Sequence, residues 1–288
     1  ARFLYREALK TEFSPPRRFF PDDELLEMDP LSRHAARREI ADAWLEGARD
    51  RLTRSLRARG LVAPLRAGEE QARLLVKEVE LFMRRDLSVF GLAGELEDHL
   101  RSGGEILPVE VDIEGIRIEG RRRLYRSGSG PGWSLEWRPG GKLRALDLIR
   151  GWVAHLAVCA CRERTPMLLV SLEECALIEG LAAAEARARL QSLLEMMLQG
   201  LEKPLPFAPE TAWAYIRKAH GPEGEALAAA EQAWEGHRGL PGDGDDAYQR
   251  RALGEAGPVS HPRFPEVARA VFAPLLEKLQ GVRSWPTT

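Results

Sequence analysis

One short stretch of the chain combines residue types that occur in metal-dependent nucleases. The segment LEWRPG places Glu136 two residues before Arg138, shortly after the arginine-rich segment RRRLYR. In such nucleases an acid on one strand and an E-x-K or D-x-K triplet on the next bind Mg²⁺, and the metal and the lysine activate a water molecule. Arg138 stands where that lysine would be, and a guanidinium stays protonated and is too weak a base to replace it freely.

The position of the second acid is also changed. It is expected three residues after a glycine, in a G-x-x-D pattern, and counting from Gly120 that position holds Arg123. An arginine there repels Mg²⁺, and we expect it to pair with Glu136 instead. Because side chains alternate along a strand, Arg121 and Arg123 share one face of their strand, as Glu136 and Arg138 share one face of theirs. If the two faces coincide, an ion pair occupies the place of the metal. Glu136, Arg138 and Arg123 are then vestiges of a site with no catalytic residue and no bound metal.

The arginine-rich strand suggests a second hypothesis, contact with DNA. Arg121, Arg123 and Arg126 are candidates for phosphate contacts, and Tyr125 is a candidate for stacking on a base. Glu119 shares the face of Arg121 and Arg123 and weighs against this interpretation. The alternative is an exposed edge strand that is protected by its charges.

The elements that would position these residues follow from hydrophobic periodicity. Apolar and charged residues alternate over 109–113 and again after Gly115, which predicts a β-hairpin. The other core elements are predicted by the same criterion: a helix over 69–87, a strand over 133–138, a buried helix over 142–161, a strand over 166–172 and a helix over 182–201. The result is an α/β fold of mixed α+β type, and its core order, αβββαβ, is that of PD-(D/E)xK nucleases.

Helices are predicted on both sides of this core. One opens near Ser32 and runs to about residue 60, and another closes the chain over about 264–280. We therefore expect an N-terminal helical extension (1–66), a nuclease-like α/β core (67–204) and a C-terminal helical extension (205–288). We expect them to pack as one compact domain and to form a fragment of a longer chain.

The composition of the 288 residues is that of an ordinary globular protein. The net charge of −2 does not by itself indicate a nucleic-acid partner. No apolar run approaches the ~18 residues that span a bilayer, and three cysteines without a secretory signal favour a cytoplasmic location. The acidic segment DGDD, residues 243–246, fails the calcium-loop pattern, so we interpret it as an ordered turn.

Six stretches are more distinctive when they are considered together. They are ARFLYREAL, DPLSRHAARREI, LEWRPGGKLRALDLIRGWVAHLAVCA, EKPLPFAPETAWAYI, AWEGH and GDGDDAYQRR. In this order, over nearly the whole chain, they resemble the C-terminal region of the RecC family, the gamma subunits of exodeoxyribonuclease V. None of them is a catalytic signature. The Gln-x-x-x-Tyr motif of active nuclease relatives has no counterpart, because residues 141–165 contain no glutamine.

This resemblance implies a subunit of a bacterial RecBCD helicase–nuclease, which processes double-strand DNA ends in repair and recombination. It implies a nuclease-like domain without nuclease activity that helps to split or guide DNA. The implied partners are DNA ends and the beta and alpha subunits, RecB and RecD. The complex would use ATP and Mg²⁺, whereas this domain would bind no cofactor.

Two alternatives remain open. The first is an active Mg²⁺-dependent exonuclease that uses Glu136 with other acids, such as Asp112 or Glu119. The second is a protein-interaction scaffold without DNA contact, in which the DGDD loop and the apolar segment LPFAPETAWAYI matter more than the arginines.

Overall fold

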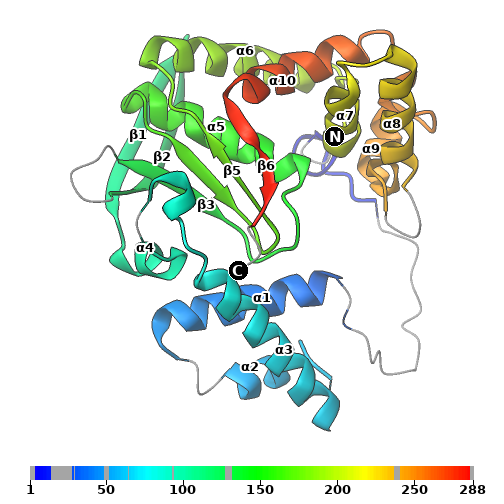
Figure 1. Ribbon diagram of the computed structural model, residues 1–288. Coiled ribbons are helices and arrows are strands. Elements are labelled where there is room, and N and C mark those ends of the chain that lie inside the picture. Colours follow the sequence, from blue (N-terminus) through cyan, green and yellow to red (C-terminus); the bar gives the residue numbers. More distant parts are fainter. Residues whose placement is uncertain are drawn as a thin grey trace.

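A six-stranded sheet crosses the middle of the molecule and carries helices on both faces (Figure 1). The computed structural model describes residues 4–13, 28, 30–48, 52–63, 65–92, 94–126, 132–236 and 241–285. Its mixture of helices and strands is the mixed α/β class that the sequence predicts.

The spatial order of the strands follows the chain. They are β1 (Glu105–Ile113), β2 (Ile116–Tyr125), β3 (Trp133–Trp137), β4 (Met167–Val170), β5 (Glu174–Ile178) and β6 (Leu279–Ser284). Neighbouring strands are antiparallel except for β3 and β4, which run parallel and are joined through helix α5 (Ala145–Cys161). The predicted succession of hairpin, third strand, helix and fourth strand is thus present.

The predicted hairpin is formed by β1 and β2. Ile113 pairs with Ile116 across a two-residue turn of Glu114 and Gly115, whose φ angles are 53° and 82°. Two positive φ angles are typical of the tight turn whose twist matches that of antiparallel strands. Val109, Val111 and Ile113 point into the core while the residues between them are exposed, as the alternation predicts.

The helices divide according to the face of the sheet that they cover. One face packs against α1 (Pro30–Glu46), α2 (Leu52–Ala58), α3 (Leu65–Met83) and α4 (Leu96–Ser102). The apolar cluster on the other face contains residues of α5, α6 (Ala183–Glu202), α7 (Pro209–Lys218), α8 (Glu223–Glu235) and α10 (Phe264–Lys278). Helix α9 (Ala247–Leu253) lies beside α7 and α8 in Figure 1. No helix in the described part of the chain is long and apolar enough to cross a lipid bilayer.

Strand β4 shows how the sheet separates two apolar clusters. Met167 and Leu169 pack with α5 and α6, whereas Leu168 and Val170 pack with the helices α1 to α4. All four are at most 1% exposed. A strand that is buried on both faces has a continuous apolar sequence, which explains why MLLV does not alternate.

The single helix predicted from about Ser32 to residue 60 is wrong. The structure contains α1 and α2 instead, and α1 ends at Glu46. Gly47 follows with a φ of 74°, and its N–H donates to the carbonyl of Trp44 at 3.2 Å. A left-handed glycine directly after the last turn is a common way for a helix to end.

The C-terminal extension is not wholly helical, which corrects a second prediction. Helix α10 ends at Lys278, and β6 then pairs with β5 at the edge of the sheet. Trp285 follows β6 and is 7% exposed; its indole N–H donates to the carbonyl of Ser171 at 2.8 Å. The chain therefore returns to the sheet after its last helix.

Candidate functional site

Glu136 and Arg138 lie where β3 ends, beside the first turn of α5. The Arg138 N–H donates to the carbonyl of Val170 on β4 at 2.9 Å, which holds the end of β3 in the sheet. A Cβ atom at Gly140 would lie 2.6 Å from the Nε atom of Arg138. The glycine therefore leaves the room that the arginine side chain occupies.

Both residues of the altered triplet form ion pairs. Glu136 pairs with Arg122 on β2, with 2.8 Å between Arg122 Nη2 and Glu136 Oε2. Arg138 pairs with Asp147 on the first turn of α5. The side chains of Arg138 and Asp147 are 29% and 18% exposed, so this pair is mostly withdrawn from solvent. Each group that could have served a metal site is thus bound to an opposite charge.

The predicted partner of Glu136 was wrong by one residue. Leu124 pairs with Ser134 and Tyr125 with Trp133, and continuing this antiparallel register places Arg122 opposite Glu136. Residues that face each other across a ladder share a face of the sheet. Arg123 consequently lies on the other face and cannot pair with Glu136.

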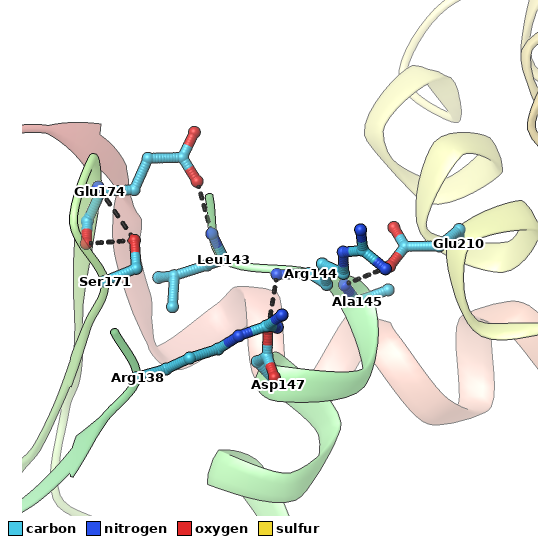
Figure 2. Close-up of polar contacts among 8 residues, drawn as sticks. All are labelled: Arg138, Leu143, Arg144, Ala145, Asp147, Ser171, Glu174 and Glu210. Atoms are coloured by element: carbon cyan, nitrogen blue, oxygen red, sulfur yellow. Dashed lines mark hydrogen bonds and ion pairs between the residues drawn. The ribbon is translucent and has the colours of Figure 1, made fainter. Parts of the chain in front are cut away.

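Three carboxylates hold the backbone at the start of α5 (Figure 2). Glu174 accepts a hydrogen bond from the Leu143 N–H at 2.9 Å, and Asp147 accepts one from the Arg144 N–H at 3.0 Å. Glu210, which comes from α7, accepts one from the Ala145 N–H at 3.1 Å. The first N–H groups of a helix have no partner within the helix, so these carboxylates satisfy groups that would otherwise be left open.

Sequence patterns assigned no role to these three acids. Asp147 follows Arg144 by three residues, which is the position of the acid in a capping box, so a local signal did exist. Glu174 and Glu210 are 31 and 65 residues away from the backbone groups that they bind. No local pattern indicates contacts at such separations.

Glu210 adjoins the acidic turn that the sequence predicted at residues 243–246. Asp243 accepts hydrogen bonds from the backbone N–H and the hydroxyl of Thr211, both at 2.9 Å, and Asp246 accepts one from the Tyr248 N–H at the start of α9. The predicted ordered turn is confirmed. Burial, followed by the charge of Asp243, raises the pKa of Glu210, and burial also raises the pKa of Asp243.

A pocket of about 340 Å³ opens beside these ion pairs, between α1, β3 and α5. We call it the arginine pocket; its charged and titratable lining residues are His34, Arg38, Glu136, Arg138, Arg144, Asp147 and Arg150. Four arginines thus face two carboxylates. Burial, followed by the charges of Arg138 and Arg38, lowers the pKa of His34. The pocket is therefore electropositive.

The acids considered for an active exonuclease do not gather there. Asp112 pairs with Arg117 across the hairpin ladder, and Glu119 forms an ion pair with the same arginine. By alternation, Asp112 and Glu119 belong to the face of the sheet opposite to Glu136. Among the described residues, no group of three or more His, Cys, Asp or Glu side chains could hold a metal ion.

The candidates for DNA contact have different surroundings. Arg121 and Arg123 are exposed and form no ion pair in the described part of the chain. Arg126 is exposed but pairs with Glu105 at 2.9 Å. Tyr125 is only 5% exposed and packs against the rings of His99 and Trp133. Its ring is therefore not accessible for the stacking on a base that the sequence suggested.

Two comparisons with known proteins agree with each other. The family described as the RecC C-terminal domain matches residues 1–220. The chain is also similar to the RecBCD enzyme subunit RecC of Escherichia coli (strain K12), with 23% identity over 287 residues. That match covers 95% of this chain and 24% of the relative, so the chain spans about a quarter of the relative's length.

Proposed function

Because the chain belongs to the RecC C-terminal domain family, we propose that it is the C-terminal part of the gamma subunit of a RecBCD-type helicase–nuclease. In this role it cleaves no DNA. It helps to guide or split DNA at double-strand ends and docks the beta and alpha subunits, RecB and RecD, during repair and recombination in the cytoplasm. ATP and Mg²⁺ serve other parts of the complex, and this domain binds neither.

The pairing of both triplet residues with opposite charges carries the non-catalytic part of this proposal. The order of β1, β2, β3, α5 and β4 supports an inactive PD-(D/E)xK core. The residues do not fit a Mg²⁺ ion, because Arg122 neutralises Glu136 and Arg138 occupies the place of the lysine. A metal at Glu136 would lie against an arginine that repels it, and the other carboxylate of the arginine pocket, Asp147, is already bound to Arg138.

The docking part is supported by an apolar groove between the hairpin and the helices α5, α6, α9 and α10. It has a volume of about 1090 Å³, and Leu146, Val153 and Met197 line it while remaining 42%, 39% and 53% exposed. Extended apolar surface of this kind marks interfaces between proteins. We assign the groove to the alpha subunit, RecD, and the exposed Arg121 and Arg123 to contact with DNA.

A forked DNA duplex with Mg²⁺ tests the proposal. We expect the fluorescence anisotropy of the labelled duplex to rise when the 288-residue chain is added, and to rise less at higher salt, because phosphate contacts release counterions. We expect no cleavage with time. Mg²⁺-dependent cleavage that disappears in Glu136→Ala would establish the exonuclease alternative and overturn the proposal.

The scaffold without DNA contact is the second candidate. It is favoured by the size of the apolar groove and by the net charge of −2. Salt-independent anisotropy, together with binding of the alpha subunit, would establish it. Under this alternative, Arg121→Ala with Arg123→Ala leaves assembly with the alpha subunit unchanged.

A further inference from the structure

The arginine pocket has more positive charge than its own acids can neutralise. Asp147 binds Arg138, and Glu136 is bound by Arg122, which lies outside the pocket lining. Neither Arg144 nor Arg150 forms an ion pair in the described part of the chain. Both are exposed. The charge of Arg144 acts on the carboxyl of Glu210, whereas that group binds the Ala145 N–H. Both guanidinium groups are therefore available to a ligand.

The shape of the pocket also points to a ligand of a particular kind. Its volume of about 340 Å³ exceeds what a single phosphate fills, and apolar side chains of Trp137, Leu143 and Leu146 line it together with the arginines. A phosphate attached to a sugar presents both kinds of surface. Guanidinium groups bind phosphate oxygens with paired hydrogen bonds, which makes arginine the usual residue for this contact.

One polar atom in the pocket lacks a partner. The Nδ1 atom of His34 is buried and accepts or donates no hydrogen bond among the described residues. Arg38, one turn further along α1, lies 5.5 Å from the centre of the Trp137 ring and holds that wall of the pocket. His34 is thus placed to report on the charge inside the pocket.

From this arrangement we propose that the arginine pocket binds a phosphate group of a single DNA strand, with Arg144 and Arg150 as the contacting residues. The choice of DNA as the source of the phosphate rests on the proposed function. The pocket lies where an active nuclease would bind the phosphate that it cleaves. Here the arginines retain a phosphate without a metal to activate water.

The pKa of His34, followed by NMR, tests the pocket directly. One of the six histidine signals is assigned to His34 with His34→Gln. Burial and the charges of Arg138, Arg38 and Arg37 lower this pKa, and only Asp147 opposes them. We expect a single-stranded thymidine oligonucleotide without terminal phosphates to raise it, because a phosphate bound in the pocket brings a negative charge close to the imidazole. Inorganic phosphate, at matched ionic strength, shows whether a free phosphate enters as well. If neither ligand raises the pKa of His34, the proposal is overturned.

Arginine variants then locate the contact. We expect Arg144→Gln with Arg150→Gln to abolish the effect on His34, to weaken oligonucleotide binding about tenfold, and to lower its salt slope by about 1.4, for two lost single-strand phosphate contacts. Arg187→Gln with Arg217→Gln, which removes the same charge from exposed positions elsewhere, controls for net charge. Weakening by this control to the same extent would overturn the proposal.

The outcomes separate the pocket from the proposed function. If inorganic phosphate raises the pKa of His34 through Arg144 and Arg150 but the oligonucleotide does not bind, the pocket stands and the DNA role fails. If the oligonucleotide binds and only Arg121→Gln with Arg123→Gln weakens it, the DNA role stands and the pocket is overturned.

Discussion

Helix α5 contains two polar regions, and they accommodate polar groups in opposite ways. At its first turn, Asp147 forms an ion pair with Arg138, which follows β3, at the border of solvent. Further along, His155 is completely buried, and its Nε2 atom donates to the carbonyl of Glu179 at 2.9 Å. Burial lowers the pKa of His155 to about 4, so this residue is neutral. The partly exposed acid is held by an oppositely charged partner, whereas the deeply buried histidine is neutral, because burial penalises an unpaired charge.

The buried region predicts the largest effect, a loss of stability in acid. The unfolded chain binds a proton at His155 near pH 6.5, whereas the folded chain binds it only near pH 4. As the pH falls through this interval, the unfolded state gains protons first, and the free energy of unfolding decreases by up to about 3 kcal/mol. Urea denaturation at a series of pH values measures this loss. We expect His155→Gln to flatten the curve, while His220→Gln at an exposed position should leave it as it is. If His155→Gln leaves the curve unchanged, burial of His155 is not the cause of the acid sensitivity, and the contrast between the two polar regions of α5 is wrong.

The charged region predicts an intermediate effect. Asp147→Ala leaves Arg138 without its carboxylate and the Arg144 N–H without its acceptor. We expect a decrease of about 2 kcal/mol in the free energy of unfolding, about 1 kcal/mol from the lost cap and about 1 kcal/mol from an ion pair that is still partly exposed to solvent. Chemical denaturation measures it as a lower midpoint with an unchanged slope. Asp147→Asn keeps an acceptor for Arg144 and should lose less; equal losses in the two variants would show that the cap contributes little.

The more exposed ion pair between Arg122 on β2 and Glu136 predicts the smallest effect. Arg122→Ala removes the partner of Glu136, whose side chain is 43% exposed, so solvent already weakens this pair. We expect a loss below about 1 kcal/mol. Arg123→Ala, one residue further and on the opposite face, should have no measurable effect on the denaturation midpoint. A larger loss in Arg123→Ala than in Arg122→Ala would contradict the register of β2 and β3.

The sequence was sufficient for those elements whose pattern is local. The hairpin alternates with a period of two, and the apolar sequence MLLV has the length and composition of a buried strand, so both could be predicted. Glu136 and Arg138 could be located at the end of β3 for the same reason. The pairing of Glu136 could not, because a shift of one residue in register exchanges Arg122 for Arg123 and moves the side chain through the sheet.

Strands β5 and β6 were missed for a different reason. Each is short, and β6 directly follows a helix, so its sequence LQGVRS has no strand pattern that outweighs the helix before it. The two strands are stabilised by pairing with each other across a long stretch of chain. The same holds for Glu174 and Glu210, whose role at the start of α5 depends on contacts that only the folded chain creates.

The late position of β6 has a consequence for the order in which the molecule is made. Cys175 and Arg283 lie 108 residues apart in sequence, yet they face each other in the sheet. A ribosome synthesises β5 well before it synthesises β6, so β5 remains an open sheet edge while the helices between them are translated. During that interval a strand from another nascent chain can occupy the place of β6. We therefore expect this domain to be most prone to aggregation before β6 has left the ribosome.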